Sequence, residues 1–328
     1  MGKLREIHMK ELPRWILVVA ILLGNDSLVL AGEKELTGSI TLSGAWAIYP
    51  TAVAWKEAFE KIHPKVKIDV SAGGAGKGAA DAIAGLVDIG MVSRDPDPSE
   101  LKRGIQAVYI LKDAVFPVVS EKNFFIRELL EKGMPRQVLV DIYISGTIRR
   151  WNQITGLKAN KPIHVYTRSD SSGAAAAWAA YLGKKQEDLK GVGVYGDPGL
   201  LGAVQRDPAG IGYNNFCYVF TREGPLFSGI KLVPVDSNEN GVADADEIFE
   251  NRNQAIMAIT TGRYPPVRKN YFFIKKQESY GKGTNPLVEE FIRFALSDQG
   301  TKIVEEVGTS LPIPPEERES VLKILEER

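Results

Sequence analysis

Twice in this sequence a strand-like run is followed by a loop of small residues and then by a helix rich in alanine. The first such unit has a strand at 66–70, a loop with four glycines at 71–78 and a helix that ends near residue 86. The second has a strand at 163–166, a serine-rich loop and a helix at 172–182. Strands that alternate with helices are typical of α/β proteins in which neighbouring strands run parallel. We therefore expect an α/β fold with sheets flanked by helices.

Both loops place a helix start where it could receive an anion. The first N–H groups of a helix have no partner within the helix, and the helix dipole is positive at that end. In the second loop Arg168 adds a planar guanidinium group that suits phosphate, sulfate or carboxylate. In the first loop the glycines allow the backbone to approach a ligand closely. These features predict an anion site, and a serine-capped helix beside a surface arginine is the alternative.

Two classes of activity can be excluded. The glycine loop resembles a nucleotide-binding P-loop, but Lys77 is followed by Gly78 and Ala79 instead of serine or threonine. No hydroxyl group is therefore placed to hold Mg²⁺, and we exclude nucleotide hydrolysis. The 41 basic and 41 acidic residues leave no net charge to attract nucleic acid, so we expect no nucleic-acid partner.

Residues 1–31 have the pattern of a secretory signal peptide. Four basic residues precede the apolar run 15–23, and Val29 and Ala31 occupy the −3 and −1 positions of a small-residue cleavage pattern. Nine apolar residues are too few to cross a bilayer comfortably, so cleavage is favoured over a retained membrane anchor. We expect a mature chain that begins near Gly32 and is exported, to the periplasm or to the extracellular face of the cell membrane.

Residues 236–247 match the twelve-residue calcium loop of an EF-hand at every ligand position. A strand at 230–235 precedes the loop where an EF-hand has a helix, whereas a helix is expected to follow, from Glu247 into 249–260. Oxygen ligands at this spacing predict a structural calcium ion, and a metal-free turn rich in Asn and Asp is the alternative. The predicted ligands are Asp236, Asn238, Asn240, Val242 through its carbonyl group, Asp244 and Glu247.

Six short segments resemble, in order and spacing, the phosphate-binding proteins of bacterial and archaeal phosphate ABC transporters. Each motif is weak alone, but six in the right order are specific. The resemblance extends from about Leu36 to Pro314, nearly the whole expected mature chain. The segments are residues 43–50, 73–78, 87–94, 143–151, 168–174 and 209–213.

This resemblance implies a type II periplasmic-binding-protein fold, in which two α/β lobes with mixed sheets are joined by two crossover strands. The passages between the lobes are expected near 118–119 and near 271–272. Lobe one would then comprise 34–118 and 272–328, and lobe two would comprise 119–271 with the calcium-type loop. The ligand is expected between the lobes, with hinge closure as the usual motion.

The resemblance also implies which residues touch the ligand. Ile48 and Tyr49 would contribute backbone groups, and Arg168 would contribute positive charge. The full set of candidate ligand-binding residues is Ala47, Ile48, Tyr49, Ala75, Gly76, Lys77, Ser93, Arg94, Arg168, Ser172, Gly173 and Ala174.

Some of these residues differ from those usual in the family. Many members have an aspartate, which accepts the proton of a monohydrogen oxyanion, where this chain has Ser93. Lys77 and Arg94 are the candidates for compensating charge. Phosphate is the first expectation for the ligand, and sulfate, molybdate and tungstate are the alternatives. Hydroxyl residues are usual in the family at the positions of Ala47, Ile48, Ala75 and Ala174.

These observations predict an exported solute-binding protein that captures phosphate and delivers it to the permease of an ABC transporter. We expect a monomer without enzymatic activity, because no nucleophile with a partner base and no metal pair is evident beside the anion loop. The alternatives are a receptor for another oxyanion and a secreted phosphate-ester hydrolase that uses Ser172 as its nucleophile.

Overall fold

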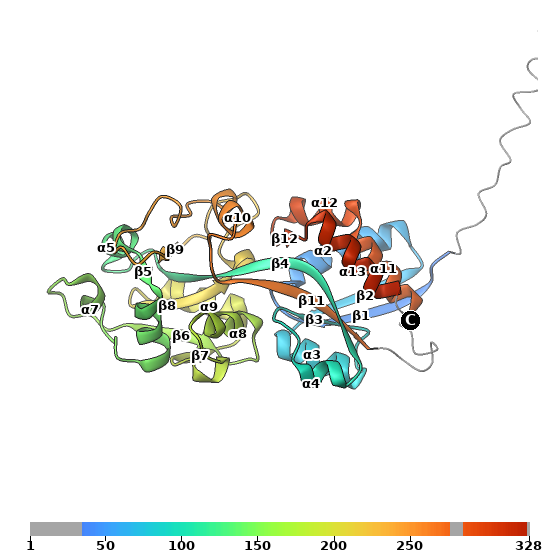
Figure 1. Ribbon diagram of the computed structural model, residues 1–328, viewed down its shortest axis with the longest axis horizontal. Coiled ribbons are helices and arrows are strands. Elements are labelled where there is room, and N and C mark those ends of the chain that lie inside the picture. Colours follow the sequence, from blue (N-terminus) through green and yellow to red (C-terminus); the bar gives the residue numbers. More distant parts are fainter. Residues whose placement is uncertain (1–34, 276–284, 327–328) are drawn as a thin grey trace, which may run out of the picture. The chain divides into compact units, whose positions relative to one another are not determined.

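Strands and helices alternate along the chain in the computed structural model, which describes residues 35–275 and 285–326 (Figure 1). The predicted signal peptide, residues 1–31, lies outside the described residues. None of the helices in the described part of the chain combines the length and the apolar character that a bilayer-spanning helix needs. The predicted α/β class is confirmed, because helices flank a mixed sheet of parallel and antiparallel strand pairs.

The strands of the main sheet follow one hydrogen-bonded path, β2-β1-β3-β11-β4-β8-β6-β7. β12 and β9 pair with β4 beside this path, and β10 and β5 form a separate parallel pair. The strand bounds are β1 (Gly38–Gly44), β2 (Val66–Ala72), β3 (Ile89–Val92), β4 (Ile105–Ser120), β5 (Met134–Pro135), β6 (His164–Arg168), β7 (Val192–Val194), β8 (Gly210–Asn215), β9 (Ile230–Leu232), β10 (Val235–Asp236), β11 (Val267–Lys275) and β12 (Leu311–Pro312).

Helices cover both faces of the strands. In Figure 1, α2, α11 and α12 lie on one face of β1, β2 and β3, and α3 and α4 lie on the other. The α-helices are α2 (Tyr49–Ile62), α3 (Ala75–Ala84), α4 (Pro98–Lys102), α5 (Ile126–Lys132), α6 (Arg136–Val140), α7 (Asn152–Thr155), α8 (Gly173–Tyr181), α9 (Gly196–Arg206), α10 (Arg252–Thr260), α11 (Pro286–Leu296), α12 (Asp298–Val307) and α13 (Pro315–Glu326). A π-helical turn, Asp141–Ser145, and two 3₁₀ turns, Gln186–Asp188 and Phe216–Tyr218, complete the helical segments of the described residues.

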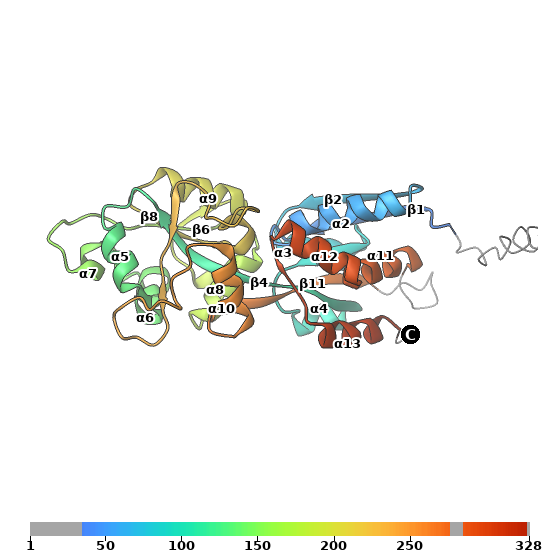
Figure 2. The same ribbon diagram turned by 90° about the horizontal axis from the view of Figure 1, so that it is seen from above.

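The strands and helices form two lobes. Lobe one comprises β1, β2, β3 and β12 with α2–α4 and α11–α13, and lobe two comprises β5–β10 with α5–α10. Two long strands, β4 and β11, run antiparallel and side by side between the lobes (Figure 2). These two strands are the chain connections between the lobes in the described residues.

The passage of β4 between the lobes lies at Ala114 and Val115, a few residues before the predicted position at 118–119. Up to Ala114 the strand pairs with β11, and from Val115 onward it pairs with β8. The strand stays extended while its partner changes, and the charged pair Lys112 and Asp113 directly precedes the passage. The returning passage belongs to β11, which begins at Val267, ahead of the predicted 271–272.

The predicted strand 230–235 is in fact two short strands, β9 and β10. Pro234 lies between them and has no N–H group to donate to a ladder. Its carbonyl oxygen instead accepts a hydrogen bond from Met134 N at 2.8 Å. The chain therefore changes partner from β4 to β5 just before the predicted calcium loop.

The helix predicted from Glu247 begins later, because α10 starts at Arg252. The Asn251 side chain accepts hydrogen bonds from the backbone N–H groups of Asn253 and Gln254 and so caps the helix. The predicted calcium loop is therefore followed by an irregular segment, and neither of its ends adjoins a helix as in an EF-hand.

Each lobe has an apolar core that anchors its helices. In lobe one Trp55 of α2 packs against Phe272 of β11, with ring centroids 6.0 Å apart. In lobe two Trp178 of α8 stacks on Tyr213 of β8 at 5.7 Å. Burial of a large apolar side chain contributes about 1.5–3 kcal/mol. These contacts fix α2 in lobe one and α8 in lobe two.

Candidate anion-binding site

Three helix starts lie where the two lobes touch. In lobe one, α2 follows β1 and α3 follows β2, and these two strands are parallel. The loops that follow parallel strands lie at the same edge of a sheet, so the starts of α2 and α3 lie close together. The start of α8 in lobe two contacts this same edge. The positive dipole ends of three helices are therefore gathered in one region. The backbone N–H groups of Ile48 and Tyr49, two predicted donors, both donate to the Ala45 carbonyl oxygen at 3.2 Å.

The start of α3 is hydrogen-bonded to the loop before α8. Gly76 N donates to the Ser171 carbonyl oxygen at 3.0 Å. A Cβ on Gly74 would lie 2.6 Å from a carboxylate oxygen of Asp170, so only glycine permits this approach. The predicted glycine loop and the predicted Arg168 loop thus meet, although 92 residues separate Gly76 from Arg168 in the sequence.

Ser93 of lobe one lies against Gly173 at the start of α8. Ser93 is buried, and a Cβ on Gly173 would overlap both its Oγ and its carbonyl oxygen. Beside it, the Ser172 hydroxyl oxygen caps α8 by accepting from the N–H groups of Ala174 and Ala175 at 3.2 and 3.4 Å. The candidate residues from 93 and from 172–174 are therefore neighbours, and the Ser172 hydroxyl has a structural role as a helix cap.

The loop before α2 also reaches lobe two. Ala47 and Ile48 are fully buried, and the Ala47 carbonyl oxygen accepts from Cys217 Sγ at 4.0 Å. The ring of Trp46 packs edge-on against Tyr195, with centroids 6.2 Å apart. Lobe two thus contacts the segment that directly precedes the candidate backbone donors, Ile48 and Tyr49.

Arg168 is held by two carboxylates. Its Nε and Nη2 donate to the two oxygens of Asp170 at 2.8 and 2.5 Å, and its Nη1 donates to Asp197 at 2.5 Å. The side chain is buried; burial opposes the charge, but Asp197 and Asp170 raise the pKa of Arg168 above its ordinary value. A guanidinium has five N–H groups, so one on each Nη atom remains to reach an anion. The group is thus a fixed cation with two directed donors.

Asp170 and Asp197 were not among the residues predicted from the sequence. Asp170 gave a usable signal, since an acid two residues from a candidate arginine is close enough to pair with it. Asp197 could not have been predicted, because an acidic residue in the first turn of a helix such as α9 is already explained by its favourable interaction with the helix dipole. Only the approach of α9 to β6 shows that Asp197 is a partner of Arg168.

Two candidate cations are paired with carboxylates of their own lobe. Lys77 bonds to Asp81 one turn further along α3, and about half of its side chain is exposed. Arg94 donates to both carboxylate oxygens of Glu100, at 2.9 and 2.6 Å. Each of these side chains therefore has a partner in its own lobe, as Arg168 has, and Arg94 lines a cavity together with Ser171 and Ser172 of lobe two.

The predicted calcium loop is organised by its own hydrogen bonds. The buried carboxylate of Asp236 accepts from the backbone N–H groups of Asn240 and Gly241 at 3.2 and 2.9 Å. The carboxylate of Glu247 accepts from Ser237 N at 2.6 Å. The carboxylates at the first and last ligand positions therefore both turn toward the backbone of the loop.

The middle of this loop presents amide nitrogen where calcium would need oxygen. The side-chain amides of Asn238 and Asn240 donate to the Asp244 carboxylate at 2.7 and 2.9 Å. Val242, whose carbonyl is a predicted ligand, is largely exposed. Within the described residues, no three His, Cys, Asp or Glu side chains are grouped closely enough to hold a metal ion in this arrangement. The chemistry of the donors suits calcium, but both asparagine amides would have to turn before their oxygens could bind it.

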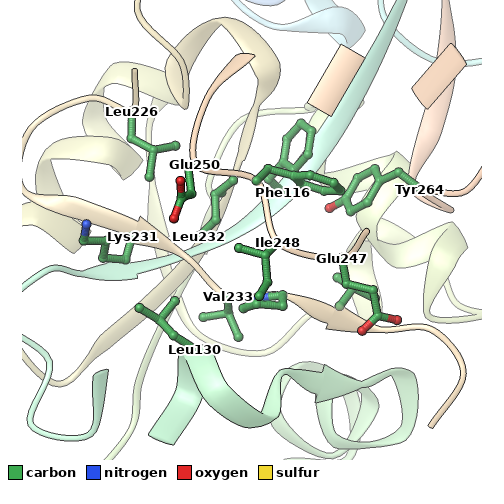
Figure 3. Close-up of a pocket in the computed structure, with 13 residues that line it drawn as sticks. Phe116, Leu130, Leu226, Lys231, Leu232, Val233, Glu247, Ile248, Glu250 and Tyr264 are labelled. Carbon is green, nitrogen blue, oxygen red and sulfur yellow. The ribbon is translucent and has the colours of Figure 1, made fainter. Parts of the chain in front are cut away.

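A cavity of about 380 Å³ in lobe two lies beside this loop (Figure 3). Most of its wall is apolar and includes Phe116, Leu232 and Ile248. Lys231 supplies the one basic side chain among its lining residues. A small, strongly hydrated anion needs several N–H donors in place of water, so this cavity is a poor match for it. The helix starts where the lobes touch therefore match an anion better than this cavity does.

The chain matches a family model described as a PBP superfamily domain, over residues 31–299. The phosphate-binding protein PstS of Bacillus subtilis is 26% identical over 274 residues, which cover 83% of this chain and 80% of that protein. The phosphate-binding protein PstS of Methanocaldococcus jannaschii is 28% identical over 327 residues, which cover 84% of this chain and 82% of that protein. A crystal structure from Clostridium perfringens, assigned as a phosphate ABC transporter substrate-binding protein and containing bound phosphate, is 25% identical with a TM-score of 0.68, and the match covers 84% of this chain and 100% of that one.

Proposed function

Because this chain belongs to the PBP superfamily, we propose that it is a solute-binding protein that captures phosphate where its lobes meet and delivers it to an ABC transporter. The observation that carries the proposal is the position of Arg168, a buried and fixed cation whose partner Asp170 contacts Gly74 at the start of α3. A tetrahedral oxyanion presents acceptor oxygens on all sides and so matches donors that come from two lobes. Sulfate, molybdate and tungstate share this shape and are the competing ligands.

We place the protein outside the cell membrane and expect it to act as a monomer with a membrane permease as its partner. The signal-peptide pattern of residues 1–31 supports export. The name of the Clostridium perfringens structure, a substrate-binding protein of an ABC transporter, supports a permease as the partner. In this arrangement the protein carries the anion and performs no chemistry on it.

The surroundings of Ser172 support binding over hydrolysis of a phosphate ester. Its hydroxyl oxygen is engaged as the cap of α8. The two described histidines lie elsewhere: His63 packs against Phe59, and His164 contacts Asp207 at 2.7 Å. Neither is therefore placed to act as its general base. The purified protein should release no p-nitrophenol from p-nitrophenyl phosphate above a protein-free blank.

The central experiment is isothermal titration of the protein lacking residues 1–31 with phosphate, sulfate, molybdate and tungstate in turn. Saturable binding of phosphate, with at least tenfold weaker binding of the other three, is the expected result. Tighter binding of another anion would keep the site and change the ligand. Failure of all four anions to bind would overturn the proposed function.

The site assignment predicts that Arg168→Ala abolishes phosphate binding, because the two remaining directed N–H groups are lost with the charge. Arg127→Ala is the matched control, since Arg127 is an exposed arginine of lobe two that pairs with Glu131 on α5. This control should bind phosphate as the wild type does. Wild-type affinity in Arg168→Ala, with a folded protein by circular dichroism, would refute the assignment.

We also propose that residues 236–247 bind a structural calcium ion. The support is the oxygen donor at each ligand position, together with a loop that already folds around Asp236 and Glu247. Calcium would be held by Asp236, Asn238, Asn240, the Val242 carbonyl, Asp244 and Glu247 after the two asparagine amides turn.

Calcium should raise the melting temperature by several degrees over a sample with chelator, because a ligand that binds only the folded state stabilises it. Glu247→Ala should remove this rise. The control is Asp246→Ala, since Asp246 is a half-exposed acid of the same loop at a position that ligates no metal. A melting temperature that does not respond to calcium in the wild type would contradict the proposal.

A further inference from the structure

A chain of buried polar side chains connects Arg168 with the two crossover strands. The Arg168 Nη1 donates to Asp197 Oδ2 at 2.5 Å, and Asp197 Oδ1 accepts from Asn215 Nδ2 at 2.7 Å. Asn215 Oδ1 in turn accepts from Arg268 Nη2, which also donates to Asp113 Oδ2 at 2.6 Å. Each of the five residues is more than nine-tenths buried. The chain therefore joins the cation of the anion site to the strands between the lobes without a gap.

The far end of this chain lies where β4 changes its partner. Asp113 on β4 and Arg268 on β11 are register partners in the last pairs before the passage. Asn215, at the end of β8, is the register partner of Val115, the first residue of β4 to pair with lobe two. Arg268 thus connects the β4–β11 pair of lobe one with the end of β8 in lobe two. A change in the angle between the lobes must act at this point, because β4 and β11 are the connections.

The middle of the chain governs how Arg168 is oriented. A guanidinium is planar, so its direction decides where its two remaining N–H groups point. Asp197 fixes that plane on the side away from Asp170. Burial raises the pKa of Asp197, and the charges of Arg168 and Arg268 oppose that rise. The amide of Asn215 supplies a further donor to the Asp197 carboxyl oxygen, so loss of that donor would loosen the partner of Arg168.

We propose that Asp197 and Asn215 are positioning residues for anion capture, which hold the Arg168 guanidinium in a fixed direction relative to the crossover strands. Neither needs to touch the anion. A donor that is already oriented when the lobes close loses less conformational freedom on binding, and the affinity rises accordingly. This inference rests on the proposed function, because it concerns the affinity of the same site.

The test compares two substitutions of buried asparagines by leucine at the hinge. Asn215→Leu interrupts the chain between Asp197 and Arg268. Asn270→Leu is the matched control: Asn270 lies on β11 two residues after Arg268, is fully buried, and its side-chain atoms have no hydrogen-bond partner among the described residues. Phosphate affinity is measured by isothermal titration, and the melting temperature of each variant is recorded to follow folding separately.

Asn215→Leu is expected to weaken phosphate binding about tenfold or more, while Asn270→Leu stays within about twofold of the wild type. Unchanged affinity in Asn215→Leu would overturn the inference, and so would an equal loss in both variants, which would indicate a general packing effect at the hinge. A wild type that binds no phosphate would overturn the proposed function and this inference together. If the wild type binds phosphate, the proposed function stands, and the two variants then test the positioning role alone.

Asp197→Asn provides a second route, since it keeps the volume of the side chain and removes its charge. It decides the question by the same criteria if Asn215→Leu does not fold. The double variant combines Asp197→Asn with Asn215→Leu. Its affinity for phosphate should be less than about twofold below that of whichever single variant binds phosphate more weakly, because both residues act through Arg168. Losses that multiply would show two independent effects and would contradict a shared positioning role.

Discussion

Glu100 and Arg94 show how a partner decides what a charged residue does. Arg94 follows Ser93 in the sequence and was a candidate for the anion site, yet both of its terminal nitrogens donate to Glu100. Glu100 also accepts a hydrogen bond from Asp97 N at 2.8 Å and completes the capping box of α4. The ion pair therefore stabilises the start of α4 and the segment that carries Ser93.

This pair predicts a pH-dependent contribution to stability. Burial acts to raise the pKa of Glu100, but the hydrogen bonds from Arg94 and from the Asp97 amide outweigh it and leave the pKa below its ordinary value. A carboxyl group with a lowered folded pKa stabilises the fold above its unfolded pKa, about 4.3, and the effect is lost as the pH falls through the folded value. Glu100→Gln should therefore lower the melting temperature near pH 7 and have a smaller effect at about pH 3.

Circular dichroism melts at both pH values check this expectation. Glu131→Gln is the control, because Glu131 and its partner Arg127 are both exposed, and surface pairs of this kind contribute only about 0–1 kcal/mol. An equal loss of stability at both pH values in Glu100→Gln would show that the carboxylate charge is not the cause.

The start of α8 depends on a glycine for its contact with the other lobe. Gly173 is the first residue of the helix, and Ser172 before it supplies the cap. Its backbone lies so near Ser93 that a single added methyl group would overlap two oxygen atoms. The helix itself would tolerate alanine at this position, since alanine is the better helix former. The requirement for glycine thus comes from the neighbouring lobe and not from the helix.

Gly173→Ala is therefore expected to weaken phosphate binding at least tenfold while leaving helix content and melting temperature nearly unchanged. Gly202→Ala is the matched control on α9 of the same lobe, because a Cβ there would meet only the mobile end of the Arg206 side chain. Titration calorimetry and circular dichroism measure the two effects separately. Equal affinities in the two variants would show that the approach of Gly173 to Ser93 is not needed for binding.

Across the described residues, the lobes are connected by two strands, and the loops that precede α2, α3 and α8 are among the places where they touch. The contacts of Gly76 with Ser171 and of Ala47 with Cys217 are both of this kind. Trp46 and Tyr195 add an aromatic contact beside them. One group of contacts between the lobes therefore surrounds the helix starts that are proposed to hold the anion, and a second group joins Arg222 and Arg252 of lobe two to the Glu306 and Gly308 carbonyl oxygens of lobe one. A bound anion would add bonds from both sides at the helix starts, which favours the closed arrangement.

Much of the architecture was determined by local patterns in the sequence. The apolar periodicity of α2, the glycines at 73–78 and the serine before α8 each act through residues only a few positions apart. The α/β class and the two loop-and-helix units could therefore be predicted. The limits of β9, β10 and α10 were not predicted, because each depends on one residue: Pro234 separates β9 from β10, and Asn251 caps α10.

Only the tertiary structure decided which partners the charged residues have. Arg168 meets Asp197 from 29 positions away, and Arg268 meets Asp113 from 155 positions away. The partner change in the middle of β4 likewise follows from pairing with distant strands and not from the local pattern of β4, which stays one extended strand across it. The physical reason is that a hydrogen bond or an ion pair depends on distance in space, whereas helix and strand patterns depend on spacing along the chain. The sequence thus supplied the cation and the helix starts of the site, and the packing of the two lobes supplied their arrangement.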